Sequence, residues 1–187
     1  NYSIASASSN ITQRPLNLSG SRAYDSTRTA SGSDLSFTNI VSGETLGLTG
    51  SGVLDSPAAG SRTIVNTNTL AISDGSGIAT NYTLTNGTLT MTIVPRSTTV
   101  SGTKTYDGTT NVASSNLTSF SNLAGSDTLS LSGTGTISSA DVGTGKTVNT
   151  SGLTIDNSSG VGTNYTLSSA TVNVTELVIR LRGVRAF

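Results

Sequence analysis

An internal repeat constrains this sequence more than any other feature. Residues 19–27 match 101–109, and residues 80–84 match 163–167. The offset between the two copies is 82 residues at first and 83 later. A period of this length exceeds the roughly 20–30 residues of a solenoid coil and suits a small independent β domain. The sequence therefore predicts two homologous units in tandem.

The repeat pattern and two prolines predict the boundaries of the units. Residues 1–13 are expected to be the truncated end of a preceding repeat, 14–95 the first unit and 96–176 the second. Residues 177–187 form an atypical tail that is rich in Arg and free of Ser, Thr and Asn. The tail can be an artificial extension, native sequence that continues the last strand, or a membrane-insertion signal, and these three interpretations stay open.

Hydrophobic residues alternate with polar ones in both units, as is typical of half-buried β-strands. Leu46 and Leu48 alternate in the first unit, and Leu129 and Leu131 do so in the second. No stretch shows a sustained helical period. The predicted fold class is all-β: tandem small antiparallel β domains in a linear array, each a sandwich or a β-grasp-like sheet.

Two local patterns support finer predictions. Asn86-Gly87 between alternating runs predicts a β-hairpin, because both residues of such a turn need φ > 0. The second unit has Ser169-Ala170 there, which predicts a looser or differently built turn. Residues 37–41 and 120–124 fit either a short helical turn or a strand, and we leave both possibilities open.

The composition excludes several classes of function. Lys and Arg number 10, Asp and Glu number 10, and the formal net charge is zero, so the basic footprint of a nucleic-acid-binding protein is missing. The absence of Cys and His removes disulfides, thiolate metal sites and Ser-His or Cys-His catalysis. No apolar run reaches the ~18 residues of a membrane span. We therefore expect no enzyme, no nucleic-acid partner and no membrane span.

No cofactor is expected from these residues. Calcium is the metal that suits them best, because Asp-containing loops lie at corresponding positions, 74–77 and 156–160. Neither loop has the Asp-x-Asp/Asn-x-Asp/Asn-Gly spacing with a distal Glu that an EF-hand requires, so ordinary turns are the favoured interpretation.

Two short motifs recur in both units and are the candidate site residues. A Tyr beside Asp-Gly suits a strand that buries the ring and then turns, since Asp accepts backbone hydrogen bonds and Gly takes unusual dihedral angles. In the Asn-Tyr pairs, Asn caps a turn and Tyr fills the core. We expect a structural role for these residues, with ligand contact by Tyr as the alternative: Tyr24, Asp25, Tyr106, Asp107, Gly108, Asn81, Tyr82, Asn164 and Tyr165.

The motifs also carry a family resemblance. Residues 104–109, 125–129 and 162–167 together resemble the YDG/MBG-type repeats of bacterial surface adhesins, as found in filamentous-haemagglutinin-like exoproteins of two-partner secretion systems. The first unit departs from this pattern at Ser26, where the family prefers Gly. The resemblance implies a structural stalk or spacer in a large secreted or cell-surface adhesin that supports cell adhesion or biofilm formation, with no catalytic residues.

The expected partners are the neighbouring repeats of the same chain, with host or matrix glycans or like chains as further candidates. The rival interpretation is a carbohydrate- or matrix-binding module that uses exposed Tyr. Burial distinguishes the two: buried Tyr24 and Tyr106 favour the spacer, whereas exposed aromatic rings on one face favour binding.

Overall fold

The computed structural model describes residues 9–180, which fold into two compact units. Of these residues, unit 1 holds 9–23 and 27–94, and unit 2 holds 24–26 and 95–180. The first residues of the predicted truncated repeat, 1–8, and the end of the tail, 181–187, lie outside the described residues. Residues 177–180, the described part of the tail, belong to no strand.

The predicted all-β class is confirmed. The helices of the described residues are four 3₁₀ turns of three residues each, at Gly32–Asp34 (η1), Ala79–Asn81 (η2), Ser114–Asn116 (η3) and Gly162–Asn164 (η4). Between residues 9 and 180, no helix has both the length and the apolar character needed to cross a membrane.

Unit 2 distributes its strands over two sheets. One sheet has the order β13-β11-β17-β15 and the other the order β12-β14-β16, so successive strands alternate between the sheets. The strands are β11 (Arg96–Thr105), β12 (Asn111–Ala113), β13 (Leu117–Ser121), β14 (Leu129–Thr136), β15 (Gly143–Val148), β16 (Leu153–Asn157) and β17 (Tyr165–Thr175).

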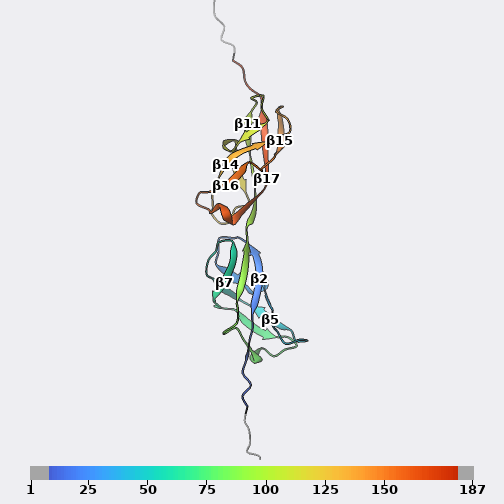
Figure 1. The fold of residues 1–187 in the computed structure, drawn as a ribbon, viewed down its shortest axis with the longest axis vertical. Helices are drawn as coiled ribbons and strands as arrows, with labels where there is room; N and C mark the ends of the chain where they lie inside the picture. The colour runs from blue at the N-terminus through green and yellow to red at the C-terminus, as the bar shows by residue number, and fades with distance from the viewer. Residues whose placement is uncertain (1–8, 181–187) are drawn as a thin grey trace, which may run out of the picture. The chain divides into compact units, whose positions relative to one another are not determined.

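The first and last strands of unit 2 form the centre of its larger sheet, and they are parallel. β11 pairs with β17 from Arg96↔Tyr165 to Thr105↔Thr175, with one irregularity between Thr98 and Thr99. Figure 1 shows the two strands side by side. The other pairings of this unit are antiparallel, as the sequence predicts. Because β11 and β17 run the same way, the chain enters unit 2 at one end of this pair and leaves at the other.

One hydrophobic core lies between the two sheets of unit 2. Val100, Val172 and Val174 reach it from the β11–β17 pair and are at most 3% exposed. Val112 of β12 and, on the core's margin, Leu131 of β14 come from the other sheet. Both layers thus share one core, which is the arrangement of a sandwich.

Unit 1 repeats this topology, but three of its strands are divided into two pieces. Its first strand is divided into β1 (Arg14–Pro15) and β2 (Leu18–Ala23), and its last into β9 (Tyr82–Thr83) and β10 (Thr90–Val94); both pairings, β1 with β9 and β2 with β10, are parallel. The remaining strands are β3 (Thr29–Ser31), β4 (Leu35–Phe37), β5 (Leu46–Thr49), β6 (Ser51–Leu54), β7 (Gly60–Asn66) and β8 (Ala71–Asp74). β5 and β6 together take the place of β14, and β5 pairs with β8 in a separate two-stranded sheet. The β6–β7 pairing joins β3, β6, β7, β10, β2 and β4, in that order, into one six-stranded sheet, labelled in part in Figure 1.

The hairpin predicted at Asn86-Gly87 is wrong. Asn86 does take a left-handed turn conformation, with φ +63°, but β9 and β10 on either side pair with β1 and β2, not with each other. Gly87 is needed for space, because a Cβ there would lie 1.8 Å from the carbonyl oxygen of Leu16. The looser turn predicted in unit 2 is also wrong, since β17 runs through Ser169 without a break.

The segments 37–41 and 120–124 are neither helical turns nor complete strands. Phe37 is the last residue of β4, and Phe120 lies in β13, which ends at Ser121. The residues that follow each strand form bends and turns. These turns matter below, because they bring an acidic residue of each unit to a tyrosine.

Candidate functional site

Two tyrosines and one carboxylate form a cluster in unit 2. The hydroxyls of Tyr24 and Tyr165 both donate to Oδ2 of Asp127, at 3.1 and 2.7 Å. The rings meet edge to face, with centroids 5.4 Å apart and an interplanar angle of 76°, which is a favoured geometry for aromatic pairs. Both tyrosines are 5% exposed. The cluster is therefore a packed and fully bonded part of unit 2, which takes in 24–26.

Burial and the shared carboxylate hold these tyrosines in the protonated form. Burial first, and then the hydrogen bond to Asp127, raise the pKa of Tyr165 to about 12. The same two causes, in the same order, raise the pKa of Tyr24. The backbone N–H of Ala124 donates to the Tyr165 hydroxyl at 3.0 Å and acts in the opposite direction, as does the side chain of buried Asn164 on Tyr24.

Unit 1 builds the same site with Glu44 in place of the aspartate. The Tyr82 hydroxyl donates to Oε2 of Glu44, and this hydrogen bond is the main cause that raises the pKa of Tyr82. The Glu44 N–H donates to the Val41 carbonyl at 3.0 Å, as the Asp127 N–H donates to the Ala124 carbonyl at 3.0 Å. Asn81, in η2 beside Tyr82, is exposed, whereas its counterpart Asn164 is buried.

A groove of about 470 Å³ lies beside Tyr82. It is lined by 11–14, Val41, Glu44 and 80–82, all of unit 1. Within 9–180, the only ring pair is that of Tyr24 with Tyr165, so Tyr82 has no ring against it there. We call this feature the Tyr82 groove.

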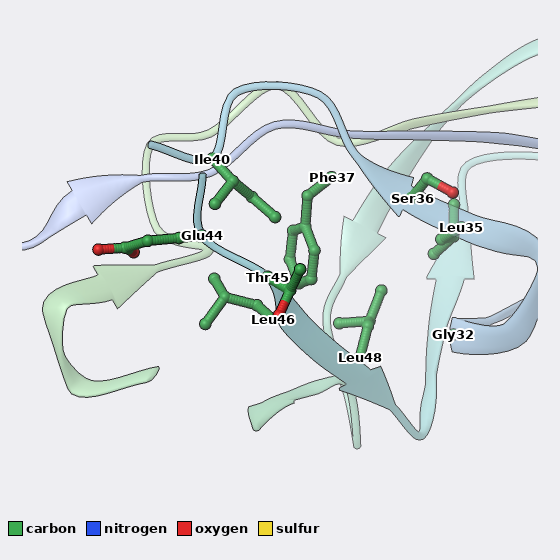
Figure 2. Close-up of a pocket in the computed structure, with 9 residues that line it drawn as sticks. All are labelled: Gly32, Leu35, Ser36, Phe37, Ile40, Glu44, Thr45, Leu46 and Leu48. Atoms are coloured by element: carbon green, nitrogen blue, oxygen red, sulfur yellow. The ribbon is translucent and has the colours of Figure 1, made fainter. Parts of the chain in front are cut away.

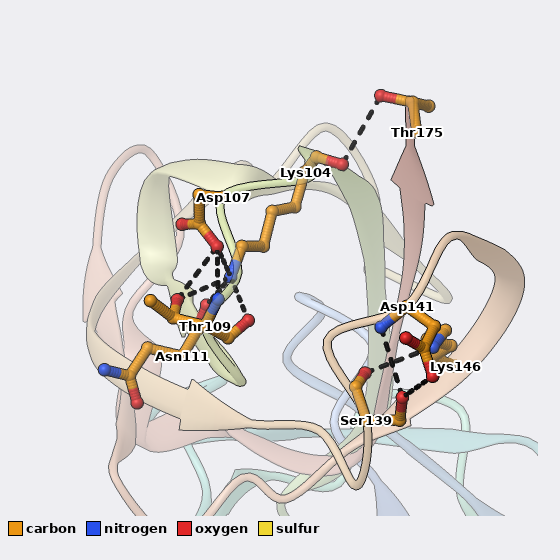
Figure 3. A network of polar contacts seen from close by, with 8 residues as sticks. All are labelled: Lys104, Asp107, Thr109, Asn111, Ser139, Asp141, Lys146 and Thr175. Carbon is orange, nitrogen blue, oxygen red and sulfur yellow. Dashed lines mark hydrogen bonds and ion pairs between the residues drawn. The ribbon is translucent and has the colours of Figure 1, made fainter. Parts of the chain in front are cut away.

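The second motif forms a turn closed by a buried cation. Lys104 is 4% exposed, and its ammonium donates to the carbonyl oxygens of Thr109 at 2.8 Å and Asn111 at 2.5 Å. It also lies 2.9 Å from Oδ1 of Asp107. The Asp107 carboxylate in turn accepts the N–H and the hydroxyl of Thr109, both at 2.9 Å. Figure 3 shows Lys104, Asp107 and Thr109 converging on this turn.

This turn fixes the charge of Asp107 and the backbone of Gly108. The ammonium of Lys104, followed by the Thr109 N–H, lowers the pKa of Asp107 to about 2. Gly108 has φ +75°, a left-handed conformation that favours glycine. In the first copy of the repeat the corresponding residue is Ser26, which takes φ +66° with a side chain. The departure from Gly at Ser26 therefore leaves the turn geometry unchanged.

The two Tyr-Asp motifs differ in where the tyrosine lies. Tyr24 is 5% exposed and sits in the cluster with Asp127, whereas Tyr106 is 40% exposed. Asp25 is half-buried. The sequence expectation that Tyr24 is buried is met, and the same expectation for Tyr106 is not, since the ring of Tyr106 packs on no other ring within residues 9–180. The repeated acid at Glu44 and Asp127, which the repeat alignment contains, is the signal that could have placed the cluster.

The comparisons with known proteins decide the family. The family model of the YDG domain matches residues 10–91 and, a second time, 87–172. The chain belongs to the YDG domain family. No curated protein and no solved structure matches it. The membership expected from the sequence, in YDG/MBG-type repeats of filamentous-haemagglutinin-like adhesins, is wrong, because the match names the YDG domain and nothing ties the chain to those adhesin repeats.

A pocket of about 310 Å³ in the first YDG unit is the other candidate for ligand binding. Leu35, Phe37, Ile40, Leu46 and Leu48 line it, and Figure 2 shows these apolar side chains facing one another. In the second unit the residues at the same repeat positions as two of them, Phe120 and Leu131, pack against the hydrophobic core. The pocket is therefore the margin of a core between two layers of strands.

In each of the two loops considered for calcium, one side-chain oxygen accepts a hydrogen bond from the backbone. Oδ1 of Asp74 accepts the N–H of Ala79, and Oδ1 of Asn157 accepts the N–H of Gly162, both at 2.7 Å. In the described part of the chain, no three His, Cys, Asp or Glu side chains lie close enough to hold a metal ion. The loops act as turns in both YDG units.

The positive side chains of the two units bind the protein's own backbone. Each Lys and Arg from residue 9 to 176 donates to at least one backbone carbonyl oxygen, at 2.5 to 3.3 Å. Cations used in this way hold loops in place. They are Arg14, Arg22, Arg28, Arg62, Arg96, Lys104 and Lys146.

Proposed function

We propose that each YDG unit is a structural spacer that carries tension between its first and last strands, in a secreted or cell-surface protein. The observation that supports this proposal is the parallel pairing of β11 with β17. At ~3.3 Å per residue, the ten residues of β11 advance the chain by about 33 Å from one end of the unit to the other.

The direction of the pairing determines how force acts on it. A pull on the chain before β11 and after β17 slides two parallel neighbours past each other. The ladder bonds then lie across the direction of pull and must fail together. A pull at one shared end of the two strands would instead break the same bonds one after another.

Further contacts secure the exit end of the pair. The N–H of Tyr106 donates to the carbonyl of Thr175 at 2.8 Å, and the Thr175 hydroxyl donates to the carbonyl of Lys104 at 3.4 Å. The second of these bonds is drawn in Figure 3. Since the buried ammonium of Lys104 also holds the turn that follows, the ladder ends in a fixed turn.

The experiment that tests this proposal is single-molecule pulling of the full chain from two directions. The sequence has no Cys, so paired cysteines give unique attachment points. Attachment through Ser97→Cys and Glu176→Cys applies the force in shear along β11 and β17. Attachment through Ser97→Cys and Thr163→Cys instead pulls apart the paired first residues of the two strands. We expect a several-fold higher unfolding force for unit 2 in the shear geometry. Equal forces in both geometries would contradict the proposal.

The two units supply an internal comparison. In unit 1 the parallel pairing is divided between β1–β9 and β2–β10, so fewer bonds bear the force at once. We expect two unfolding steps when the chain is pulled from its ends, with unit 1 opening at the lower force. Steps of equal force would mean that the long ladder of unit 2 gives it no mechanical advantage.

Binding to nucleic acid is the alternative function that a separate experiment must exclude. The net charge is zero, and the cationic side chains of both units donate to backbone carbonyls. Few cations are therefore available to neutralise phosphates, so counterion release should contribute little to DNA binding. We expect no shift of duplex DNA, with plain or methylated cytosine, at physiological salt. A salt-dependent complex would replace the spacer proposal with a nucleic-acid role.

The proposed location is tested separately. Intact producing cells, labelled with an antibody against the chain, should stain without permeabilisation, or the protein should appear in the culture medium. Staining that requires permeabilisation, with none in the medium, would contradict a secreted or surface location.

A further inference from the structure

The Tyr82 groove of unit 1 corresponds, residue by residue, to the place in unit 2 that Tyr24 fills. In unit 2, Tyr24 donates to Asp127, packs on Tyr165 and receives a hydrogen bond on its carbonyl oxygen from Arg96 at 3.3 Å. The repeat aligns the three partners of Tyr24 with residues of unit 1: Asp127 with Glu44, Tyr165 with Tyr82, and Arg96 with Arg14. All three unit 1 residues line the groove.

The groove has the same internal framework as the filled site. Nε of Arg14 donates to the carbonyl of Asn39 at 3.0 Å, and Nε of Arg96 donates to the carbonyl of Asn122 at 2.8 Å. The Tyr82 hydroxyl is bonded to Glu44, as the Tyr165 hydroxyl is bonded to Asp127. The carboxylate and ring that hold Tyr24 in unit 2 therefore have counterparts already in position in unit 1.

Unit 2 in turn presents a tyrosine of the kind that the groove fits. Tyr106 is 40% exposed, while its N–H is fixed to the Thr175 carbonyl and its turn is closed by Lys104. Val142 and Leu177 beside it are 50% and 57% exposed. The turn is preformed, so little conformational entropy remains to be lost when the ring is buried.

We propose that the Tyr82 groove binds the Tyr106–Asp107–Gly108 turn of a second copy of this chain, so that copies associate head to tail. The Tyr106 hydroxyl would donate to Glu44, its ring would pack on Tyr82, and Arg14 would donate to its carbonyl oxygen. The interaction is heterologous, with a different surface on each partner, and it repeats from copy to copy. It does not depend on the spacer role.

Tyrosine NMR of the full chain tests this association directly. The chain has five tyrosines, so ring labelling gives few signals, and single Tyr→Phe variants assign them. As the concentration rises from micromolar to millimolar, the signals of Tyr82 and Tyr106 should move together while those of Tyr24 and Tyr165 stay constant. Signals that do not move at millimolar concentration would overturn the proposal.

Two complementary variants give the sharpest outcome. Tyr106→Ala keeps only the groove, and Glu44→Ala keeps only the tyrosine turn. Each alone should be monomeric at concentrations where the native chain associates, with affinity reduced at least tenfold. Their equimolar mixture should form a discrete one-to-one complex, because neither partner can extend it. Self-association of either variant as tight as that of the native chain, or a mixture that stays monomeric, would overturn the proposal.

Two controls separate this association from loss of folding and from weak affinity. Asp34→Ala removes an exposed acid of unit 1 outside the groove and should leave association unchanged. A joined chain, with 1–175 followed directly by 13–187, raises the effective concentration. In this joined chain, the NMR signal of Tyr82 in the second copy should be fully shifted at every concentration. Tyr106→Ala in the first copy should move that signal back to its position in the unassociated chain. A Tyr82 signal that is unaffected by this substitution would contradict the proposal.

Discussion

Arg22 of unit 1 and Lys104 of unit 2 hold equivalent turns by the same contacts. Each cation donates to the carbonyl oxygens of the residues five and seven positions after it, at nitrogen-to-oxygen distances between 2.5 and 3.1 Å. Two chemically different cations thus make equivalent hydrogen bonds. The turn therefore requires a positively charged side chain that is long enough to reach both carbonyl oxygens.

Loss of this cation should destabilise the unit that contains it. Lys104→Met leaves the carbonyl oxygens of Thr109 and Asn111 without their buried donor, and we expect the free energy of unfolding to fall by about 2 kcal/mol. Lys104→Arg should recover at least half of that loss, because Arg22 fills the equivalent position. Denaturant unfolding followed by circular dichroism measures both. Equal losses for Met and Arg would show that the charge is not what stabilises the turn.

The Asp107 carboxylate should stabilise unit 2 only above acidic pH. Its pKa is lowered from 3.8 to about 2 by Lys104 and the Thr109 N–H, so its contribution to stability is fully present above about pH 4 and is lost as the pH falls toward 2. Asp107→Asn removes the ion pair at every pH. The difference in stability between native chain and variant should therefore shrink across this interval, as measured by thermal unfolding at several pH values. A constant difference would contradict the assignment.

Tyr165 should stabilise unit 2 up to strongly alkaline pH. Its pKa is raised from 10.0 to about 12, so the contribution of its protonated form is fully present below pH 10 and is lost as the pH rises toward 12. Asp127→Asn removes the carboxylate that keeps the proton in place and should lower this pKa. Titration of tyrosinate absorbance, compared with Tyr165→Phe, identifies the signal. An unchanged titration in Asp127→Asn would mean that burial alone sets the pKa.

Two glycines of unit 2 should respond very differently to a methyl group. A Cβ on Gly102 would lie 1.7 Å from the carbonyl oxygen of Asn116, so Gly102→Ala must displace backbone and should cost about 3 kcal/mol of stability. Gly108 has open space around it but a φ of +75°, so Gly108→Ala should cost only about 1 kcal/mol. Thermal unfolding of both variants tests this order, and the reverse order would be inconsistent with the close approach at Gly102.

The repeat and the alternation of apolar residues were enough to predict the all-β class and the equivalence of Tyr82 with Tyr165. They could not predict which strands pair. Strand alternation shows that one face of β11 is buried, but it does not show that its neighbour is β17, about 70 residues later. For the same reason Asn86-Gly87 was interpreted as a hairpin, because its local chemistry fits a turn whether or not the flanking strands pair.

The candidate site was predictable only in part. The motif residues Tyr24 and Tyr165 were singled out from the sequence, but the motif did not distinguish buried Tyr24 from exposed Tyr106. Asp127 was visible in the repeat alignment as one acid among several. Its role depends on the turn that follows β13, which brings its carboxylate to two hydroxyls at once. Such convergence depends on the folded path of the chain and has no local sequence signal.

The central pair of unit 2 joins the first strand to the last, and this has a consequence for the order in which the protein can fold. While the chain is synthesised or threaded through a pore from its N-terminus, β11 emerges without the neighbour that completes its sheet. The core between the sheets closes only when β17 arrives. A chain threaded in this way would complete the core of unit 2 only after its last strand, β17, has passed the pore.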